Sequence, residues 1–362
     1  MTTAHRILVT GAGGFIGHHL VKRLKAEGYW VRGADLKEPQ FEPSPADECE
    51  LLDLRCWDNA LKVTRRITHV YNLAADMGGI GYITSKLADI ARNNVLINAH
   101  MLQTSRMQCV ERFLFSSSAC VYAGQKQNEA IAAGLREEDA YPADPEPGYG
   151  WEKLFSEQLC DYYFRDFGFQ TRIVRFHNVY GPLTTYEGGR EKAPAAICRK
   201  VALASENGHI DVWGDGAQSR SFMYISDCVE GMLRIMASDY HEPLNLGTDE
   251  MVSVDELVEI VCDIAGKNLV KRHHLNKPQG VRGRNSDNTR LRNVVGWEPQ
   301  IRLRDGLKLT YPWIEQELRK TGRLLPIPAP LVHRQIGHNS DRDADQGNPG
   351  SAAHSRIPRT AA

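Results

Sequence analysis

The sequence predicts an α/β protein whose main element is a doubly wound parallel sheet, and two observations support this fold class. Short apolar segments that read as buried strands alternate with amphipathic segments that read as helices along the first half of the chain. A glycine-rich turn at residues 11–17 (GAGGFIG) joins the first strand to the first helix. Such alternation makes the strands parallel, because each intervening helix returns the chain to the same edge of the sheet.

The expected elements follow one another along the chain. Residues 6–10 (RILVT) form the first strand, and residues 15–27 form the first helix, which Gly28 ends. Further strands are expected at residues 29–35, 68–74, 112–116 and about 171–176. Further helices are expected at residues 83–107, 149–167, 193–204, 254–264 and 303–318. Pro312 lies inside the last of these helices and is expected to kink or end it.

Composition excludes several classes of function. The formal net charge of −1 gives no positive field to attract nucleic acid or an anionic membrane surface. No apolar run approaches the ~18 residues of a membrane span, and we expect no signal peptide ahead of the first strand. The 8 cysteines form no C-x-x-C pair, and the histidines at 18–19 and 273–274 show no metal-ligand pattern. We therefore expect a cytoplasmic enzyme with reduced thiols, no metal, and no nucleic-acid or membrane partner.

The glycine-rich turn has the features of a dinucleotide-binding loop. It follows a strand and opens a helix, so backbone N–H groups and the positive end of the helix dipole can meet a pyrophosphate. Asp35 ends the next strand, where its carboxylate can bind an adenosine ribose and repel a 2′-phosphate. NAD is therefore favoured over NADP, although Arg32 and Lys37 leave NADP open, and Asp53 and Leu54 could flank the adenine. The alternative is a turn that serves only strand–helix packing.

A Tyr-x-x-x-Lys pair can supply the proton chemistry that accompanies hydride transfer. The pattern occurs three times, at Tyr82/Lys86, Tyr122/Lys126 and Tyr149/Lys153. We interpret the first pair as a surface feature, and the second crosses Gly124, which weakens a helix. Tyr149 starts an expected helix, so Lys153 one turn later can lower the pKa of the phenol and hold the cofactor ribose. Ser117 or Ser118 can donate to the oxygen that is oxidised, or else cap the next turn.

Cys120 and Lys192 form a candidate second acid–base pair. A thiol is a usable base if its pKa falls from about 8.5, and an ammonium is a usable acid if its pKa falls from about 10.4. A plain dehydrogenase has no use for this pair. The pair has a use if a carbonyl made in the substrate acidifies the neighbouring C–H bonds. Taken alone, Cys120 could equally be a small buried side chain and Lys192 a solvated one.

These features resemble the extended short-chain dehydrogenase/reductase superfamily over roughly residues 5–325. Within it, the chain is similar to the GDP-mannose 3,5-epimerase family. The segments that carry this similarity are residues 75–81 (ADMGGIG), 117–122 (SSACVY), 175–182 (RFHNVYGP), 188–196 (GGREKAPAA), 213–222 (WGDGAQSRSF) and 280–288 (GVRGRNSDN). The context of Cys120 and the Arg190-Glu191-Lys192 run are much more specific to that family than the glycine loop or the Tyr/Lys pair.

The resemblance implies a Rossmann-type sheet that binds NAD and a smaller C-terminal α/β domain that binds a nucleotide sugar. It also implies a homodimer formed through the helices at about 83–107 and 149–167. We expect the NAD-binding domain at residues 1–177 and about 209–246, the nucleotide-sugar domain at about 178–208 and 247–330, and a flexible tail at 331–362.

The activity implied by the resemblance converts GDP-D-mannose into GDP-L-galactose, GDP-L-gulose or both. Tyr149, Lys153 and Ser118 would oxidise C4 reversibly, and Cys120 with Lys192 would invert C3 and C5 of the 4-keto sugar. The expected cofactor-binding residues are Gly11, Gly14, Phe15, Ile16, Gly17, Asp35, Asp53, Leu54, Ala74, Ala75, Tyr149, Lys153 and Phe176. The expected substrate-binding residues are Gly78, Ser117, Ser118, Cys120, Asn178, Glu191, Lys192, Lys200, Gln218, Arg220 and Arg284.

Three other functions stay open at this point. A related dehydratase has Asp-Glu where this chain has Ala119-Cys120. A simple 4-epimerase has Thr or Ser in place of Cys120 and has no use for Lys192. A regulatory protein that binds NAD without chemistry usually lacks the Tyr or the Lys, and both are present here. The guanine base rests on the resemblance alone, and the residues do not decide between single and double inversion.

Overall fold

The structure, a computed structural model, describes residues 5–130, 133–277 and 280–325. The flexible tail that the sequence predicts at residues 331–362 lies outside these described residues.

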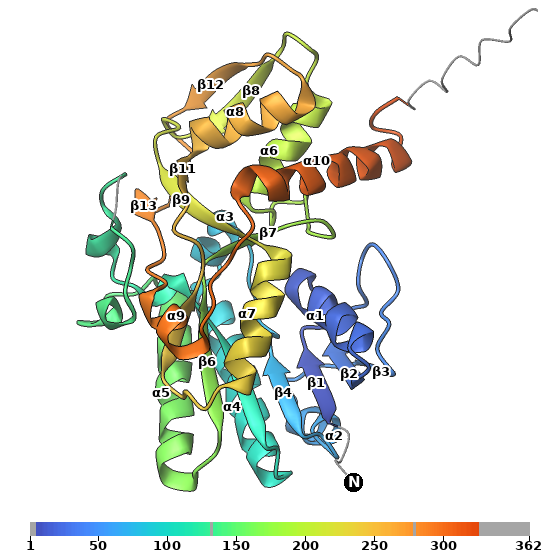
Figure 1. Cartoon of the computed structure of the whole chain (residues 1–362), viewed down its shortest axis with the longest axis vertical. Coiled ribbons are helices and arrows are strands. Elements are labelled where there is room, and N and C mark those ends of the chain that lie inside the picture. Colours follow the sequence, from blue (N-terminus) through green and yellow to red (C-terminus); the bar gives the residue numbers. More distant parts are fainter. Residues whose placement is uncertain (1–4, 131–132, 278–279, 326–362) are drawn as a thin grey trace, which may run out of the picture. The chain divides into compact units, whose positions relative to one another are not determined.

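Seven strands form the main sheet, in the order β10-β6-β5-β4-β1-β2-β3. Figure 1 labels β6, β4, β1, β2 and β3 of this sheet. Every neighbouring pair is parallel. The prediction of a doubly wound parallel sheet is therefore confirmed. The strands are β1 (Arg6–Thr10), β2 (Trp30–Asp35), β3 (Glu48–Leu51), β4 (His69–Asn72), β5 (Arg112–Ser118), β6 (Thr171–Phe176) and β10 (Pro243–Leu246).

Helices cover both faces of this sheet, because successive residues of a strand point to opposite sides. Ile7 and Val9 of β1 belong to an apolar cluster that includes side chains of α1 (Phe15–Ala26) and α7 (Ile225–Ala237). Leu8, between them, belongs to a second cluster built with α2 (Trp57–Val63), α4 (Leu87–Met107) and α5 (Tyr149–Phe167). This burial on both faces explains why the strands read as continuous apolar runs rather than as alternating patterns.

Short strands in the second half of the chain form two small sheets. β9 (Ser219–Tyr224) pairs with β7 (Asn178–Tyr180), β11 (Met251–Ser253) and β13 (Gly283–Arg284), while β8 (His209–Trp213) pairs with β12 (Val270–His274). The helices of this half are α6 (Ala193–Leu203), α8 (Val254–Ala265), α9 (Thr289–Val295) and α10 (Leu303–Lys320). α10 continues through Pro312, so the predicted end at that residue does not occur. Within the described ranges, no helix has the length and apolar character needed to cross a bilayer.

The helix that the sequence predicts at residues 83–107 is in fact two helices. α3 (Ile80–Ser85) and α4 are separated by Lys86, whose backbone leaves the helical region at φ −136° and ψ 45°. The helix N-terminal to this break, and the loop before it, lie beside both of the cavities described below.

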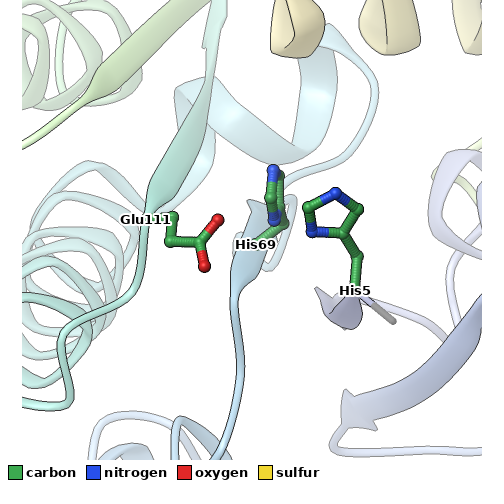
Figure 2. A group of neighbouring side chains, drawn as sticks. All are labelled: His5, His69 and Glu111. Atoms are coloured by element: carbon green, nitrogen blue, oxygen red, sulfur yellow. The ribbon is translucent and has the colours of Figure 1, made fainter. Parts of the chain in front are cut away.

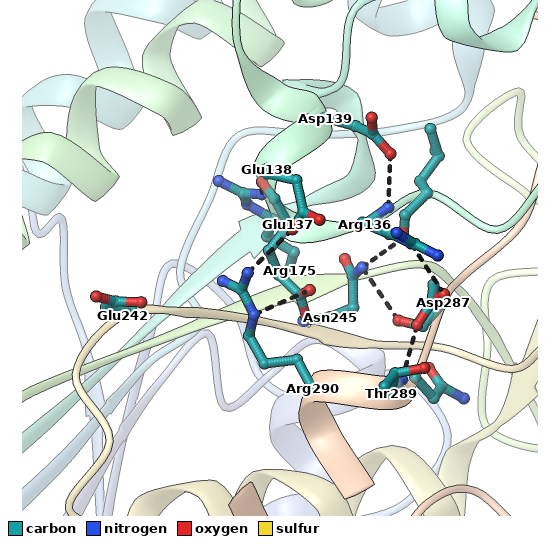
Figure 3. A network of polar contacts seen from close by, with 12 residues as sticks. Arg136, Glu137, Glu138, Asp139, Arg175, Glu242, Asn245, Asp287, Thr289 and Arg290 are labelled. Atoms are coloured by element: carbon teal, nitrogen blue, oxygen red, sulfur yellow. Dashed lines mark hydrogen bonds and ion pairs between the residues drawn. The ribbon is translucent and has the colours of Figure 1, made fainter. Parts of the chain in front are cut away.

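A network of polar contacts fastens the short helix η3 (Glu137–Ala140) to the sheet and to α9 (Figure 3). Arg175 Nη1 of β6 donates to Glu137 O at 2.6 Å, and Asn245 N of β10 donates to Glu137 Oε1 at 2.9 Å. Arg290 of α9 pairs with Glu137 and with Glu138. Because Arg175 also pairs with the buried Glu157 at 2.7 Å, this network holds the end of β6, from which the next residues reach the cavities.

Candidate functional site

The glycine loop lies at the carboxyl end of β1 and makes close contacts that only glycine permits. Gly11 has φ +71°, and a Cβ at Gly13 would lie 2.0 Å from the carbonyl oxygen of Lys37. Asp35, at the end of β2, accepts a hydrogen bond from Gly13 N at 2.9 Å. The bare loop backbone, the start of α1 and the carboxylate fit an adenine dinucleotide.

A cavity of about 620 Å³ opens over this loop, and we call it the cofactor cavity. The residues that the sequence predicts to bind NAD come from the ends of several strands. All of them line this cavity: Gly11, Gly14, Phe15, Ile16, Gly17, Asp35, Asp53, Leu54, Ala74, Ala75, Tyr149, Lys153 and Phe176.

A second cavity of about 430 Å³ shares lining residues with the first, and we call it the sugar cavity. Gly78, Ser118, Tyr149 and Lys192 line both, so the two cavities meet at the predicted redox tyrosine. Ser117 lines the cofactor cavity instead, and its hydroxyl donates to the buried Glu157. The other predicted substrate residues line the sugar cavity: Gly78, Ser118, Cys120, Asn178, Glu191, Lys192, Lys200, Gln218, Arg220 and Arg284.

Tyr149 and Lys153 lie one turn apart at the start of α5, and both are buried. Lys153 Nζ lies 5.4 Å from the centroid of the Tyr149 ring and 3.6 Å from Glu152 Oε1. Burial raises the pKa of Tyr149 well above its usual value; Glu152 and Cys120 add to the rise, and a hydrogen bond with Ser118 opposes it. The predicted fall in the pKa of Tyr149 is therefore wrong for this structure. Burial dominates, and the Glu152 carboxylate is the next largest cause of the rise.

Cys120 and Lys192 reach the sugar cavity from different segments. Cys120 lies in the short helix η1 (Ala119–Val121) after β5, and Arg284 Nη1 donates to its Sγ at 3.6 Å. Lys192 immediately precedes α6, and burial lowers the pKa of its ammonium; Cys120 opposes this fall and Arg284 adds to it. A lowered pKa suits an amine that must release and regain a proton. A thiol, an amine and a phenol thus line one cavity.

Amide and cationic side chains in the sugar cavity contact the backbone of β8. Lys200 Nζ donates to Asp211 O at 2.7 Å, and Gln218 Nε2 donates to Trp213 O at 2.7 Å. Burial lowers the pKa of Arg220 to about 10, which leaves its guanidinium positive at neutral pH. Positive groups of this kind suit a diphosphate.

Two residues beside the site were missed or misinterpreted from the sequence. The sequence interpretation of Tyr82 as a surface feature is wrong, because Tyr82 lines the cofactor cavity and its hydroxyl donates to Asp76 Oδ1 at 2.7 Å. The sequence analysis does not predict a role for Glu152, whose side chain is only 1% exposed. A carboxylate directly before a lysine that must be buried was the available signal for Glu152. No comparable signal exists for Tyr82, because its place beside the cavity depends on contacts such as that with Asp76, which no local pattern predicts.

His5, His69 and Glu111 form a group of possible metal ligands among the described residues (Figure 2). One ligand atom of each lies within 4.8 Å of the others. Because these residues precede or begin β1, β4 and β5, the group lies at the amino edge of the sheet, whereas the cavities open at its carboxyl edge. The group therefore belongs to neither cavity, and the expectation of a metal-free enzyme stays a prediction.

Comparisons with known proteins agree with this geometry. Residues 7–247 match the model of the NAD dependent epimerase/dehydratase family. The chain is 50% identical over 317 residues to GDP-mannose 3,5-epimerase 1 of Oryza sativa subsp. indica, covering 87% of this chain and 83% of that protein. It is 49% identical over 317 residues to GDP-mannose 3,5-epimerase of Arabidopsis thaliana, with coverages of 87% and 83%.

Solved structures show the same fold. UDP-glucose 4-epimerase of Thermotoga maritima superposes with a TM-score of 0.77 at 26% identity, covering 86% of this chain and 99% of that one. UDP-glucuronic acid 4-epimerase from Bacillus cereus, solved with UDP-glucuronic acid and NAD, gives a TM-score of 0.74 at 26% identity, covering 86% and 99%. With its glycine loop, its Tyr/Lys pair and these relatives, the chain belongs to the NAD dependent epimerase/dehydratase family, and NAD is its cofactor.

Proposed function

We propose that this enzyme is a GDP-mannose 3,5-epimerase. The observation that carries the proposal is that Cys120 and Lys192 line one cavity with Tyr149. A 4-epimerase needs only the redox tyrosine, whereas inversion at C3 and C5 needs groups that move protons on carbon. Relatives that share 49–50% identity over 317 residues bear the name GDP-mannose 3,5-epimerase.

The first step we propose is oxidation at C4 of the mannose ring. Bound NAD would supply reversible hydride transfer at C4. Tyr149 removes the proton of the C4 hydroxyl, so the C4–H and O–H bonds break as the C4 carbonyl forms. Ser118, which hydrogen-bonds Tyr149, is placed to donate to the same oxygen. Lys153, whose Nζ lies 5.4 Å from the centroid of the Tyr149 ring, would hold the cofactor ribose and stabilise the phenolate.

The second step exchanges protons at C5 and C3, which the C4 carbonyl acidifies. Cys120 and Lys192 serve as the proton-transferring pair, one group removing a proton from carbon and the other supplying one to the opposite face. Arg284 Nη1 donates to Cys120 Sγ at 3.6 Å, so a guanidinium lies beside the thiol that we assign to proton transfer. Each C–H bond that breaks is remade with inverted configuration. The hydride then returns to C4, so NAD ends the cycle unchanged.

The nucleotide is held by the amide and cationic side chains of the sugar cavity. We propose that Lys200, Gln218, Arg220 and Arg284 bind the GDP end, and that Gly78, Asn178 and Glu191 contact sugar or phosphate. Arg220 and Arg284 suit the diphosphate, because a guanidinium donates two parallel hydrogen bonds to neighbouring oxygens. Guanine itself is supported only by the names of the relatives.

We propose a homodimer formed through α4 and α5. These helices expose a set of large apolar side chains that a partner subunit could cover: Leu87, Leu96, Met107, Trp151, Phe155, Tyr162 and Phe167. The cytoplasmic compartment, the two-domain division and the absence of nucleic-acid and membrane partners stay predictions of the sequence.

Turnover of GDP-mannose in D₂O, followed by NMR of the products, tests the proposed function. No cofactor is added beyond the NAD that the protein retains. Deuterium at C3 and C5, with an inverted product, is the expected result. Label at neither position, or inversion at C4 alone, would remove the proposal. The same spectra show whether the reaction stops at GDP-L-gulose or reaches GDP-L-galactose.

A further inference from the structure

We propose that Glu152 is a positioning residue that holds the Lys153 ammonium and, through Asn94, anchors the segment 76–82 that lies between the two cavities. The inference rests on the proposed function, because it assigns a second role to the helix that carries the redox pair. One connected set of contacts would then hold both Lys153 and the segment 76–82 in the wall of the sugar cavity.

Glu152 is a buried carboxylate whose oxygens are both engaged. Asn94 Nδ2 donates to Oε1 at 2.8 Å, and Asn98 Nδ2 donates to Oε2 at 3.3 Å. Lys153 Nζ lies 3.6 Å from Oε1 and is itself only 1% exposed. A buried charge is tolerated only where partners replace the lost water. The Glu152 carboxylate therefore balances the buried positive charge of Lys153, next to the redox tyrosine.

Asn94 of α4 connects this carboxylate to the segment 76–82. Its Oδ1 accepts from Asp76 N at 2.6 Å, and its Nδ2, besides binding Glu152, donates to Asp76 O at 3.1 Å. Both backbone groups of Asp76 are thus held by one side chain. The Asp76 carboxylate accepts from Tyr82 OH at 2.7 Å and from Asn93 Nδ2 at 3.1 Å. These bonds fix both ends of the segment.

The segment also touches the part of the chain that carries Lys192. The Arg190 guanidinium lies 3.9 Å from the centroid of the Tyr82 ring, an arrangement that attracts a cation. A Cβ on Gly79 would lie 3.3 Å from Glu191 O, so the two backbones are close. Gly78 lines both cavities. A continuous set of contacts therefore runs from Lys153 through Glu152, Asn94 and Asp76 to the segment before Lys192.

The negative charge of Glu152 affects the pKa of Tyr149, and this effect distinguishes a positioning residue from one that only supports the fold. Ionisable groups near the Tyr149 ring are Cys120 of η1 and Tyr82 of α3, besides Glu152 and Lys153 on its own helix. After burial, Glu152 is the largest contributor to the raised pKa of Tyr149. Removing its charge should therefore let the phenol ionise at lower pH. A residue that only fills space would not do this.

The test compares Glu152→Gln with Glu157→Gln, an equally buried glutamate on the same helix that pairs with Arg175. In the NAD-loaded enzyme we expect Glu152→Gln to lower kcat about tenfold, the loss of one charge-assisted contact. We also expect the acidic limb of its pH–kcat profile to move to lower pH. Glu157→Gln should reduce thermal stability and leave the limb in place. An unmoved limb and an unchanged kcat in Glu152→Gln would overturn the proposal.

A second measurement needs no turnover, so it separates failure here from failure of the proposed function. Hydrogen exchange of the amides in segment 76–82 is measured in wild type, Glu152→Ala and Glu157→Ala. Faster exchange there in Glu152→Ala, but not in Glu157→Ala, is expected. Equal exchange in all three proteins contradicts the link, whether or not GDP-mannose reacts. If wild type leaves GDP-mannose unchanged while segment 76–82 is loosened in Glu152→Ala, only the proposed function fails.

Discussion

The cofactor cavity and the sugar cavity are built by different means. The cofactor cavity is lined largely by residues at the carboxyl ends of neighbouring strands, with glycines where a Cβ would collide with the chain. The sugar cavity is formed by side chains from segments far apart in sequence, with Cys120, Lys192 and Arg284 among them. A local motif can therefore encode NAD binding, whereas specificity for a sugar depends on how distant loops meet.

Tyr149→Phe tests the point where the two cavities meet, and it has the largest expected effect. Without the phenol, no group accepts the C4 hydroxyl proton, so kcat should fall by ~10²–10⁴-fold. NAD should remain bound, because the glycine loop is untouched. Steady-state turnover measures the loss of kcat, and the NAD released on denaturation measures how much cofactor the variant retains. A variant that turns over normally would place the redox base elsewhere.

Cys120→Ser should block proton transfer in the sugar cavity and leave NAD binding in the cofactor cavity unchanged. The serine hydroxyl is a much weaker acid than the thiol, so turnover should fall by roughly 10²-fold while GDP-mannose and NAD still bind. Reduction of bound NAD, read at its absorbance band, should still occur on adding substrate. Cys109→Ser, at an exposed position, is the matched control and should keep full activity. Full activity in Cys120→Ser would exclude the thiol from the reaction.

Asp35→Ala should weaken the cofactor cavity alone. The carboxylate at the end of β2 is placed for an adenosine ribose, so NAD affinity should fall by about tenfold and the preference over NADP should narrow. Cofactor titration monitored by thermal shift measures both. The nearby exposed Glu38→Ala should change neither affinity. An unchanged NAD/NADP ratio in Asp35→Ala contradicts the assigned role.

The smallest expected effect is a change in pH dependence. The Lys192 ammonium has a lowered pKa, so kcat should decline on the alkaline side at a pH below the ordinary value for lysine, as the amine loses its proton. Arg284 contributes to that lowered pKa, so Arg284→Gln should move the alkaline limb to higher pH at saturating substrate. Arg282→Gln, which removes a cation paired with Asp215, should leave the limb in place. If the alkaline limb lies at the same pH in wild type, Arg284→Gln and Arg282→Gln, the limb does not report the ionisation of Lys192.

Much of the cofactor cavity, and of the strands and helix that form it, could be predicted from the sequence, because the sequence signals are local. β1, α1, β2 and β6 lie where apolar periodicity and Gly28 place them, within a residue or two. All predicted NAD-binding residues line one cavity, because parallel strands end at the same edge of the sheet.

The sugar cavity and the short strands of the second half of the chain could be predicted less fully, for physical reasons. Strands as short as β11 and β13 have too few residues to show a period, and they form only through pairing with β9. The break at Lys86 leaves no mark in the apolar pattern, so the sequence predicts one helix where α3 and α4 form. Pro312 lies inside α10 because tertiary packing overrides a local preference. Burial of Glu152 depends on Asn94 and Asn98, which the chain brings from another helix.

The most direct measurement is a crystal structure with NAD and GDP-mannose bound. The account predicts Tyr149 Oη beside the C4 oxygen, with Cys120 Sγ and Lys192 Nζ on opposite faces of the pyranose, each within about 3.5 Å of C3 or C5. A sugar that places both the sulfur and the amine away from these carbons would contradict it.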